Sequence, residues 1–316
     1  MSKTYIIGHL KPDTDAVVAP LALKYLYDQA ECFGYADSQA VVSEPLNHET
    51  SFLFEKFGLE APMILESSAV SADDRFILAD HNEAGQRLEG MTEDQIVEIV
   101  DHHKLNLNLN QPIFVTNKPW GSTTTIIYFL MKQNSVKPDK TLAGLMLAAI
   151  LSDTVGFKSV TTTQKDEKYA AELAEIAGIS DIQAFAVEIL KAKSDISGLD
   201  PEQIVTNDYK IYDFAGRKTM IAQLETVEQE TLTTERQPEL LAAMAQVIKA
   251  QGLDLMFLAI TDVMAVNTKL LLPSDQEAAI ATQAFGGQVS ANLLDIGPKM
   301  SRKKEIAPPI EQAIGN

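Results

Sequence analysis

Short apolar runs alternate with segments of helical periodicity along the first 190 residues of the chain. Residues 5–8 form an apolar run that predicts a strand, and apolar residues recur at helical intervals from Asp15 onward. The same patterns predict strands near residues 40–43, 76–79 and 96–100 and helices near residues 49–57, 121–132, 141–152, 166–177 and 182–191. Strands that alternate with helices form parallel sheets. We therefore expect residues 1–190 to form an α/β domain in which helices cover the faces of a parallel sheet.

A segment rich in Ser, Gly, Asp and Pro follows this domain. Residues 194–203 read SDISGLDPEQ, and these residue types interrupt regular structure and start helices. We place a linker at residues 191–200 and a smaller α/β domain at residues 201–316. Its predicted strands lie near residues 209–214, 218–224, 254–261 and 269–272, and its predicted helices lie near residues 238–250 and 276–284.

The charge balance limits the partners of the chain. There are 26 Lys and Arg residues against 44 Asp and Glu residues, which gives a net charge of −18. Such a surface repels the phosphates of nucleic acids and of anionic membranes, because binding to either depends on Lys and Arg. Since 46% of the residues are hydrophobic, the chain can bury a sizeable core. We expect a globular protein that binds neither nucleic acid nor membrane.

Two further features favour a cytoplasmic protein. The single cysteine, Cys32, excludes an internal disulfide and a Cys-rich metal site, and we expect it to be a packing or surface residue. The N-terminus lacks the pattern of a signal peptide, and no uninterrupted apolar stretch reaches the length of about 18 residues that a membrane span needs. We therefore expect neither export nor a transmembrane helix.

Four of the five histidines directly follow predicted strands and lie beside aspartates. They are His9, His81, His102 and His103. Ligands of open parallel sheets bind outside the carboxyl ends of the strands, so side chains that are distant in sequence meet at this edge. The spacing of these histidines predicts a single site at this edge of the first domain.

The residue types at this edge favour divalent cations. Four carboxylates, from Asp13, Asp15, Asp80 and Asp153, would balance two such ions, with imidazole nitrogens as neutral ligands. Imidazole and carboxylate without thiolate suit Mn²⁺, Fe²⁺, Co²⁺ or Zn²⁺, and the excess of carboxylates favours Mn²⁺ or Mg²⁺. Two metals that share a water activate it for hydrolysis of phosphoesters or phosphoanhydrides. Alternatively, Asp13 or Asp15 simply caps the helix that follows.

Four motifs in fixed order resemble those of the DHH phosphoesterase superfamily and, within it, of the family II inorganic pyrophosphatases. They read GHLKPDTD at residues 8–15, DHNE at 80–83, DHH at 101–103 and SDT at 152–154. The resemblance continues into the second domain, with DYK at residues 208–210 and SRKK at 301–304. It therefore covers nearly the whole chain.

The resemblance implies specific metal ligands and an active site in the cleft between the two domains. It assigns His9 and Asp13 to one metal, Asp15, His102 and Asp153 to the other, and Asp80 to both. The implied cofactors are two Mn²⁺, with Mg²⁺ or Co²⁺ as substitutes and additional Mg²⁺ arriving with the substrate.

Three residues beside these ligands have other implied roles. His103 would face the substrate as a catalytic residue that donates a proton or a hydrogen bond to it. Asp101 and His81 would orient ligands, although a purely structural role is an equally good interpretation of His81. The segment 121–124, which opens a predicted helix, is better explained by helix capping than by phosphate binding.

A protein of net charge −18 needs cations to bind an anionic substrate. Residues 302–304 are three successive basic residues, which by themselves are typical of a solvated surface. The resemblance instead assigns Arg302 and Lys303, together with Lys210, to substrate binding, and leaves Lys304 in solvent. Arginine can bind a phosphate group through two parallel hydrogen bonds.

The expected activity is hydrolysis of inorganic pyrophosphate to two phosphates by a metal-bridging hydroxide. A DHH phosphoesterase acting on short oligonucleotides, a dinucleotide or polyphosphate is the alternative enzyme, but Gly286 and Gly287 are not followed by the histidine that such relatives carry. A non-catalytic metal-binding or nucleotide-sensing protein is the alternative from another class. The resemblance also implies a homodimer through the first domain. The apolar strand predicted near residues 113–115 is a candidate edge for pairing.

Overall fold

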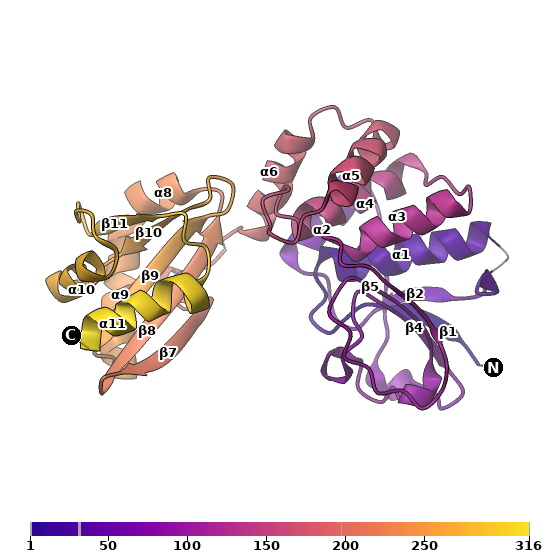
Figure 1. The fold of residues 1–316 in the computed structure, drawn as a ribbon, viewed down its shortest axis with the longest axis horizontal. Helices are drawn as coiled ribbons and strands as arrows, with labels where there is room; N and C mark the ends of the chain where they lie inside the picture. Colours follow the sequence, from indigo (N-terminus) through magenta and orange to yellow (C-terminus); the bar gives the residue numbers. More distant parts are fainter. Residues whose placement is uncertain (1, 31–32, 197, 316) are drawn as a thin grey trace. The chain divides into compact units, whose positions relative to one another are not determined.

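The computed structural model describes residues 2–30, 33–196 and 198–315, so Cys32 and the prediction made for it lie outside the described residues. The chain divides into two compact units, Met1–Lys193 and Ser194–Asn316 (Figure 1). Each is an α/β unit, as predicted. The described residues include no helix that is both long and apolar enough to span a bilayer.

A six-stranded parallel sheet forms the base of the first unit. Its strands are β1 (Thr4–Ile7), β2 (Gln39–Val42), β3 (Met63–Ile64), β4 (Arg75–Ala79), β5 (Ile96–Asp101) and β6 (Phe114–Asn117). The spatial order is β3-β2-β1-β4-β5-β6. The direction of the order reverses at β1, so β1 and β4 are neighbours although β2 and β3 separate them in sequence. The carboxyl ends of β1, β4 and β5 therefore lie side by side.

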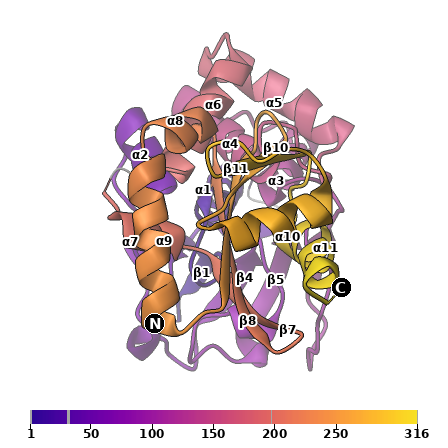
Figure 2. The same cartoon turned by 90° about the vertical axis from the view of Figure 1, so that its left-hand side faces the viewer.

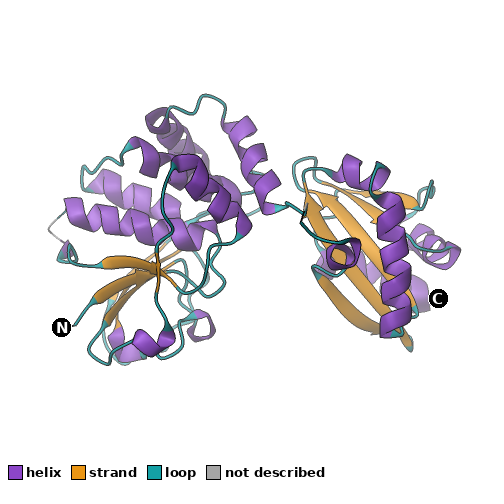
Figure 3. Cartoon of the chain, turned by 180° about the vertical axis from the view of Figure 1, so that it is seen from behind, coloured by secondary structure: helices purple, strands orange, loops and turns teal. Residues whose placement is uncertain are grey.

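The α-helices of the first unit pack over one face of this sheet, which corrects the expectation that helices cover both faces (Figures 1 and 3). They are α1 (Thr14–Gln29), α2 (His48–Phe57), α3 (Thr123–Gln133), α4 (Lys140–Asp153), α5 (Gln164–Ala177) and α6 (Ile182–Lys193). Loop residues such as Leu88, Met91 and Leu107 pack against the opposite face. Because parallel crossovers are right-handed, the β1–β2 connection and the β4–β5–β6 connections fall on opposite faces. The latter connections contain loops and 3-10 turns in place of α-helices.

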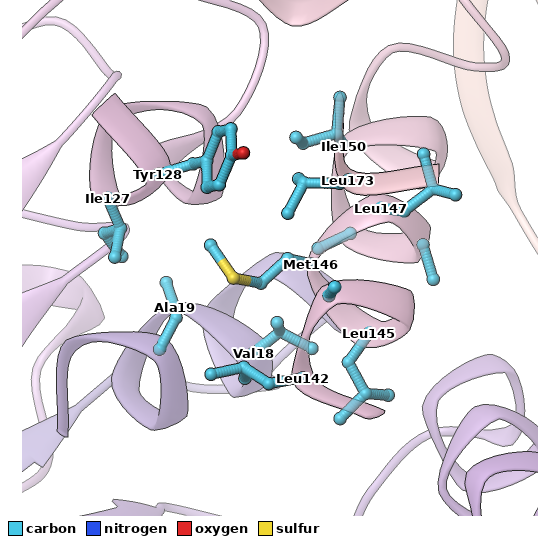
Figure 4. Close-up of a cluster of buried hydrophobic side chains, with 14 of the residues drawn as sticks. Val18, Ala19, Ile127, Tyr128, Leu142, Leu145, Met146, Leu147, Ile150 and Leu173 are labelled. Carbon is cyan, nitrogen blue, oxygen red and sulfur yellow. The ribbon is translucent and has the colours of Figure 1, made fainter. Parts of the chain in front are cut away.

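Helix α4 lies among the other helices and not directly on the sheet. Asp139 caps its start by accepting a hydrogen bond from the backbone N–H of Leu142 at 2.8 Å. Its residues from Leu142 to Ser152 are buried on all sides, and Met146 points between α1 and α3 toward Val18, Ala19 and Ile127 (Figure 4). An apolar surface around the whole circumference is typical of a fully enclosed helix. The last residue of this enclosed helix is Asp153.

The second unit contains a five-stranded mixed sheet between two helical layers. Its strands are β7 (Tyr209–Phe214), β8 (Arg217–Thr226), β9 (Leu255–Asp262), β10 (Asn267–Leu271) and β11 (Leu293–Gly297). The order is β11-β10-β9-β8-β7, and of these neighbours only β8 and β9 run parallel.

Helices lie on both faces of this second sheet. Figure 2 shows α9 (Gln237–Gln251) on one side, and α10 (Asp275–Phe285) and α11 (Ala307–Gly315) on the other. The short helices α7 (Pro201–Val205) and α8 (Gln229–Thr234) pack on the α9 side. A π-helical turn at Arg302–Ile306 leads into α11. The basic residues 302–304 therefore lie in the turn that directly precedes the last helix.

Candidate metal centre

Asp80 lies between two histidines at the carboxyl edge of the first sheet. It directly follows β4, whereas His9 follows β1 and His102 follows β5. Nε2 of His9 is 3.6 Å from Asp80 Oδ2, and Nε2 of His102 is 3.4 Å from Asp80 Oδ1. One buried carboxylate therefore presents each of its oxygens to a different imidazole.

Asp13 both caps helix α1 and approaches this cluster. Its Oδ1 accepts a hydrogen bond from the backbone N–H of Ala16 at 3.0 Å and lies 3.6 Å from His9 Nε2. The capping interpretation is thus confirmed for Asp13. A carboxylate has lone pairs for further partners after capping, so the cap does not prevent it from binding a cation.

The N-terminus of helix α3 surrounds Asp15. Its carboxylate accepts hydrogen bonds from Ser122 Oγ at 2.9 Å, from the backbone N–H of Thr123 at 2.7 Å and from that of Thr124 at 3.1 Å. Ser122 also caps α3, as the sequence predicts for this segment. The contact of this segment with Asp15 was not foreseen.

Among the residues that the structure describes, three groups of side chains bring ligand atoms within 4.8 Å of one another, close enough to hold a metal ion. The groups are His9, Asp13 and Asp80; Asp15, Asp80, His102 and Asp153; and Asp80, His102 and His103. The first two contain all six predicted ligands and have Asp80 in common. A ligand role for each of these residues stays a prediction.

The backbone orients the imidazoles of His9 and His102. Nδ1 of His9 lies 2.8 Å from the Leu10 carbonyl oxygen, and Nδ1 of His102 lies 2.9 Å from that of Trp120. A proton on Nδ1 donates to the carbonyl, so in the neutral ring the lone pair of Nε2 points into the cluster of carboxylates. This is the tautomer that a metal ligand needs.

The negative charge of the clustered carboxylates favours the binding of cations. Burial, together with the negative charge of Asp15, raises the pKa of Asp80 to about 7, and burial with the same neighbour raises the pKa of Asp153 well above its usual value. Burial lowers the pKa of His102, but contact with Asp80 outweighs burial and raises this pKa to about 10. Contact with Asp13 likewise raises the pKa of His9 to about 9 against burial. Oxygen and imidazole donors with surplus negative charge and no thiolate fit Mn²⁺.

His103 is the exposed member of the cluster. Its side chain is 51% exposed, and its Nδ1 is 2.9 Å from Asp101 Oδ1, an interaction that raises the pKa of His103. Asn82 Nδ2 donates to the other Asp101 oxygen at 2.5 Å. Burial raises the pKa of Asp101, but the hydrogen bonds from His103 and Asn82 outweigh it and lower this pKa to about 2. Sequence reasoning gave Asp101 and His103 separate roles, and it included Asn82 in the DHNE motif without a role.

His81 is buried beside Asp80 and is held by the backbone. Its Nδ1 lies 3.0 Å from the carbonyl oxygen of Ala79, whereas its Nε2 has no hydrogen-bond partner within the described residues. Burial lowers the pKa of His81 to about 4, so the ring is neutral at physiological pH. It belongs to none of the three groups that could hold a metal ion.

Lys193 approaches the cluster from helix α6, although sequence reasoning did not select it. Its Nζ lies 3.2 Å from Ser152 Oγ and 3.8 Å from Glu49 Oε2. Ser152 precedes Asp153, and Glu49 accepts a hydrogen bond from Thr14 Oγ1 at 2.8 Å. The lysine therefore contacts Ser152, which precedes Asp153, and Glu49, which is hydrogen-bonded to the residue between Asp13 and Asp15.

The second unit brings two of its predicted substrate-binding segments together. Arg302 Nη2 donates to Asp208 Oδ1 at 2.8 Å, and Nη1 donates to the Asp208 carbonyl oxygen at 3.0 Å. Lys210, two residues further along in β7, is exposed, and its Nζ lies 5.3 Å from the centre of the Tyr212 ring. Lys303 and Lys304 are both exposed.

The sequences of both units match known domain families. Residues 3–150 match the DHH family, N-terminal domain, and residues 187–313 match the DHHA2 domain. The chain is 38% identical to the manganese-dependent inorganic pyrophosphatase of Methanocaldococcus jannaschii over 98% of each chain. It is 36% identical to that of Bacillus subtilis over 99% of each chain. The chain therefore belongs to the family of manganese-dependent inorganic pyrophosphatases.

Solved structures are similar over the same length. A Methanococcus jannaschii protein assigned to the family II inorganic pyrophosphatases superposes with a TM-score of 0.63 and 36% identity, covering 99% of this chain and all of that one. An exopolyphosphatase-related protein from Bacteroides fragilis, at 15% identity and a TM-score of 0.52, shares the fold.

Proposed function

We propose that the chain hydrolyses inorganic pyrophosphate to two phosphates with bound Mn²⁺. The observation that carries this proposal is the position of Asp80, whose two oxygens face the imidazoles of two ligand groups. Membership of the pyrophosphatase family supports the choice of substrate.

Two metal ions fit the charge of the cluster. Asp13, Asp15, Asp80 and Asp153 supply four negative charges, which two divalent cations balance. His9 and Asp13 would hold one ion, Asp15, His102 and Asp153 the other, and Asp80 both. When bound, the ions supply Lewis-acid activation of a water molecule and neutralise charge on the phosphate oxygens. Mg²⁺ or Co²⁺ would substitute for Mn²⁺, and further Mg²⁺ would accompany the substrate.

His103 would donate a proton or hydrogen bond to the substrate. Asp101 holds its Nδ1, so Nε2 is the ring nitrogen that remains available to donate to a ligand. The raised pKa of His103 increases the fraction that carries both protons near neutral pH. Asp101 thus orients the ring and favours the donor form.

Arg302, Lys303 and Lys210 would bind the phosphate oxygens. In this proposal residues 1–190 form the catalytic, metal-binding domain, residues 191–200 the linker, and residues 201–316 the substrate-binding domain. Charge stabilisation by positioned cations is the main contribution a protein makes to phosphoryl transfer.

The assembly we propose is a cytoplasmic homodimer that binds neither nucleic acid nor a membrane. Strand β6 is an edge of the first sheet, and Phe114 and Val115 on it are 73% and 40% exposed. An exposed apolar edge strand is a template for pairing with another strand. Light scattering of the wild type and of Phe114→Lys tests the proposed dimer. If the dimer forms through β6, the variant should have the smaller mass in solution.

The activity is tested with metal-stripped protein to which Mn²⁺, Mg²⁺ or Zn²⁺ is returned. Pyrophosphate, ATP, polyphosphate and a short oligonucleotide serve as parallel substrates. We expect rapid, Mn²⁺-activated phosphate release from pyrophosphate alone. If the oligonucleotide or polyphosphate is cleaved while pyrophosphate stays intact, the proposed substrate is wrong. If no substrate is cleaved, the result favours a non-catalytic protein.

A further inference from the structure

Thr123 contacts two of the carboxylates that surround the candidate metal centre. Its backbone N–H donates to Asp15 Oδ2 at 2.7 Å, and its hydroxyl donates to Asp80 Oδ1 at 2.9 Å. We propose that Thr123 is a positioning residue, which holds Asp80 in the orientation that lets one carboxylate serve both ligand groups. The proposal rests on the metal site of the proposed function.

The orientation of Asp80 is demanding. Oδ2 must face His9 while Oδ1 faces His102, so rotation of the carboxylate about its bond to Cβ would break the alignment with both rings. The backbone of Asp80 is left-handed, with φ of 64°, and the side chain is 1% exposed. A terminal carboxylate torsion has a broad energy minimum, so the intrinsic preference of the side chain does not define the plane of the carboxylate. The hydrogen bond from the Thr123 hydroxyl to Oδ1 defines this plane.

Thr123 is itself well fixed. It is the first residue of α3, is fully buried, and is anchored to Asp15 through its backbone. Branching at Cβ restricts χ1 of threonine in a helix to two rotamers. The hydroxyl therefore has few alternative positions, and it ties the Asp80 carboxylate to the helix that also holds Asp15.

Helix capping does not account for this hydroxyl. The cap of α3 is Ser122, whose Oγ accepts a hydrogen bond from the backbone N–H of Thr124 at 3.1 Å. Thr124, the next residue, is equally buried, and its hydroxyl has no hydrogen-bond partner within the described structure. The two threonines are thus equally buried in the first turn of the same helix, and they differ in whether the hydroxyl contacts a predicted ligand. Thr124 is a matched control.

The experiment compares Mn²⁺ binding by three full-length variants. Thr123→Val removes the hydroxyl but keeps the shape and the backbone N–H, Thr123→Ser restores the hydroxyl, and Thr124→Val makes the same change at the control position. Metal-stripped proteins are titrated with Mn²⁺ by calorimetry, and electron paramagnetic resonance distinguishes a coupled Mn²⁺ pair from isolated ions. Circular dichroism and melting of the metal-free proteins monitor folding.

We expect Thr123→Val to weaken Mn²⁺ binding about 10–100-fold, the usual effect of removing a residue that orients a metal ligand. The coupled signal should decrease in favour of isolated ions. Thr123→Ser should restore both readouts, and Thr124→Val should match the wild type in both.

Three results would overturn the proposal: wild-type Mn²⁺ binding in Thr123→Val, equal losses in Thr123→Val and Thr124→Val, or no recovery in Thr123→Ser. Because these readouts concern metal binding alone, they separate the proposal from the proposed activity. Wild-type protein that binds Mn²⁺ but leaves pyrophosphate intact would refute the activity and leave the comparison of the threonine variants valid.

Discussion

Arg302 is held by Asp208 through two hydrogen bonds, one to the carboxylate at 2.8 Å and one to the carbonyl oxygen at 3.0 Å. The two residues are 94 positions apart in sequence, so the fold of the second unit is what brings them together. A guanidinium whose orientation is already defined loses less side-chain entropy when it binds an anion. In the proposed function, the guanidinium of Arg302 is therefore already oriented when it binds a phosphate group.

Replacing Arg302 by alanine should weaken the use of pyrophosphate and leave the metals in place. Hydrogen bonds to charged groups contribute about 1.5–3 kcal/mol, so kcat/KM should fall roughly 10- to 150-fold. Steady-state kinetics and metal analysis of the purified variant measure both quantities. Lys304→Ala, which removes an exposed cation from the same turn, is the control and should behave like the wild type. Loss of Mn²⁺ from Arg302→Ala would disprove the separation of roles between the two units.

Replacing His103 by glutamine should lower turnover with little loss of metal. Removing a general acid typically costs about 10²-fold or more in kcat. Glutamine keeps a hydrogen-bond donor of similar reach but cannot transfer a proton. The kcat and the Mn²⁺ content of the variant are the measurements. An unchanged kcat would remove His103 from the mechanism.

Replacing Asp80 by asparagine should abolish metal binding and activity together. Asparagine tolerates the left-handed backbone at this position, where φ is 64°, so the change removes charge without adding backbone strain. The two groups of predicted ligands, one with His9 and one with His102, both lose the carboxylate that they share. Retention of two Mn²⁺ by the variant, measured by metal analysis after dialysis, would contradict the assigned role of Asp80.

The stability of the metal-free protein should decrease as pH rises from about 6.5 to about 10, because below pH 6.5 the lowered pKa of His81, about 4, opposes the effect of Asp80. The raised pKa of Asp80, about 7, means that ionisation of this buried group disfavours the folded state as pH rises from 4 to 7. The raised pKa values of His9 and His102, about 9 and 10, mean that the stability their charged forms provide below pH 6.5 is lost as pH rises through those values. Asp13 and Asp101, with pKa values of about 2, lose their contribution only in strong acid.

Melting temperatures measured across this pH range, with and without Mn²⁺, test the expectation. Bound cations should remove most of the decrease, because they stabilise the ionised carboxylates and the neutral imidazoles. A metal-free protein that melts at the same temperature at pH 6.5 and pH 9 would show that these groups do not interact as their distances indicate.

The sequence predicts most elements of both units to within a few residues, because each carries a clear periodicity and a polar boundary. Strand β7 is predicted at its observed limits, and β4 and β5 differ by one residue. Strand β3 has two exposed residues, and α7 and α8 are short, so none of them has enough length for a periodic signal. The one-sided arrangement of helices was mispredicted because periodicity shows which side of a helix is buried but not which face of the sheet it covers.

The predicted ligands could be selected from sequence because each is a charged or metal-binding residue next to a motif strand or helix end. Asn82, Thr123 and Lys193 could not be selected as site residues in this way. Threonine at a helix start is ordinarily explained by capping, and an asparagine in a loop by a turn. Only the pairing of β1 with β4, and the position of α3 over their ends, shows that Thr123 reaches a carboxylate 43 residues away.

Helix α4 connects the buried core of the first unit to the candidate metal centre. A side chain at Gly144 would place its Cβ 2.4 Å from the ring of Phe57, and Asp153 is the final residue of this tightly enclosed helix. Interiors this closely packed transmit the strain of a volume change to their neighbours. Substitutions in α4 that the fold survives should therefore still move Asp153. Selection for catalytic activity should therefore exclude some substitutions in this helix that selection for folding alone would tolerate.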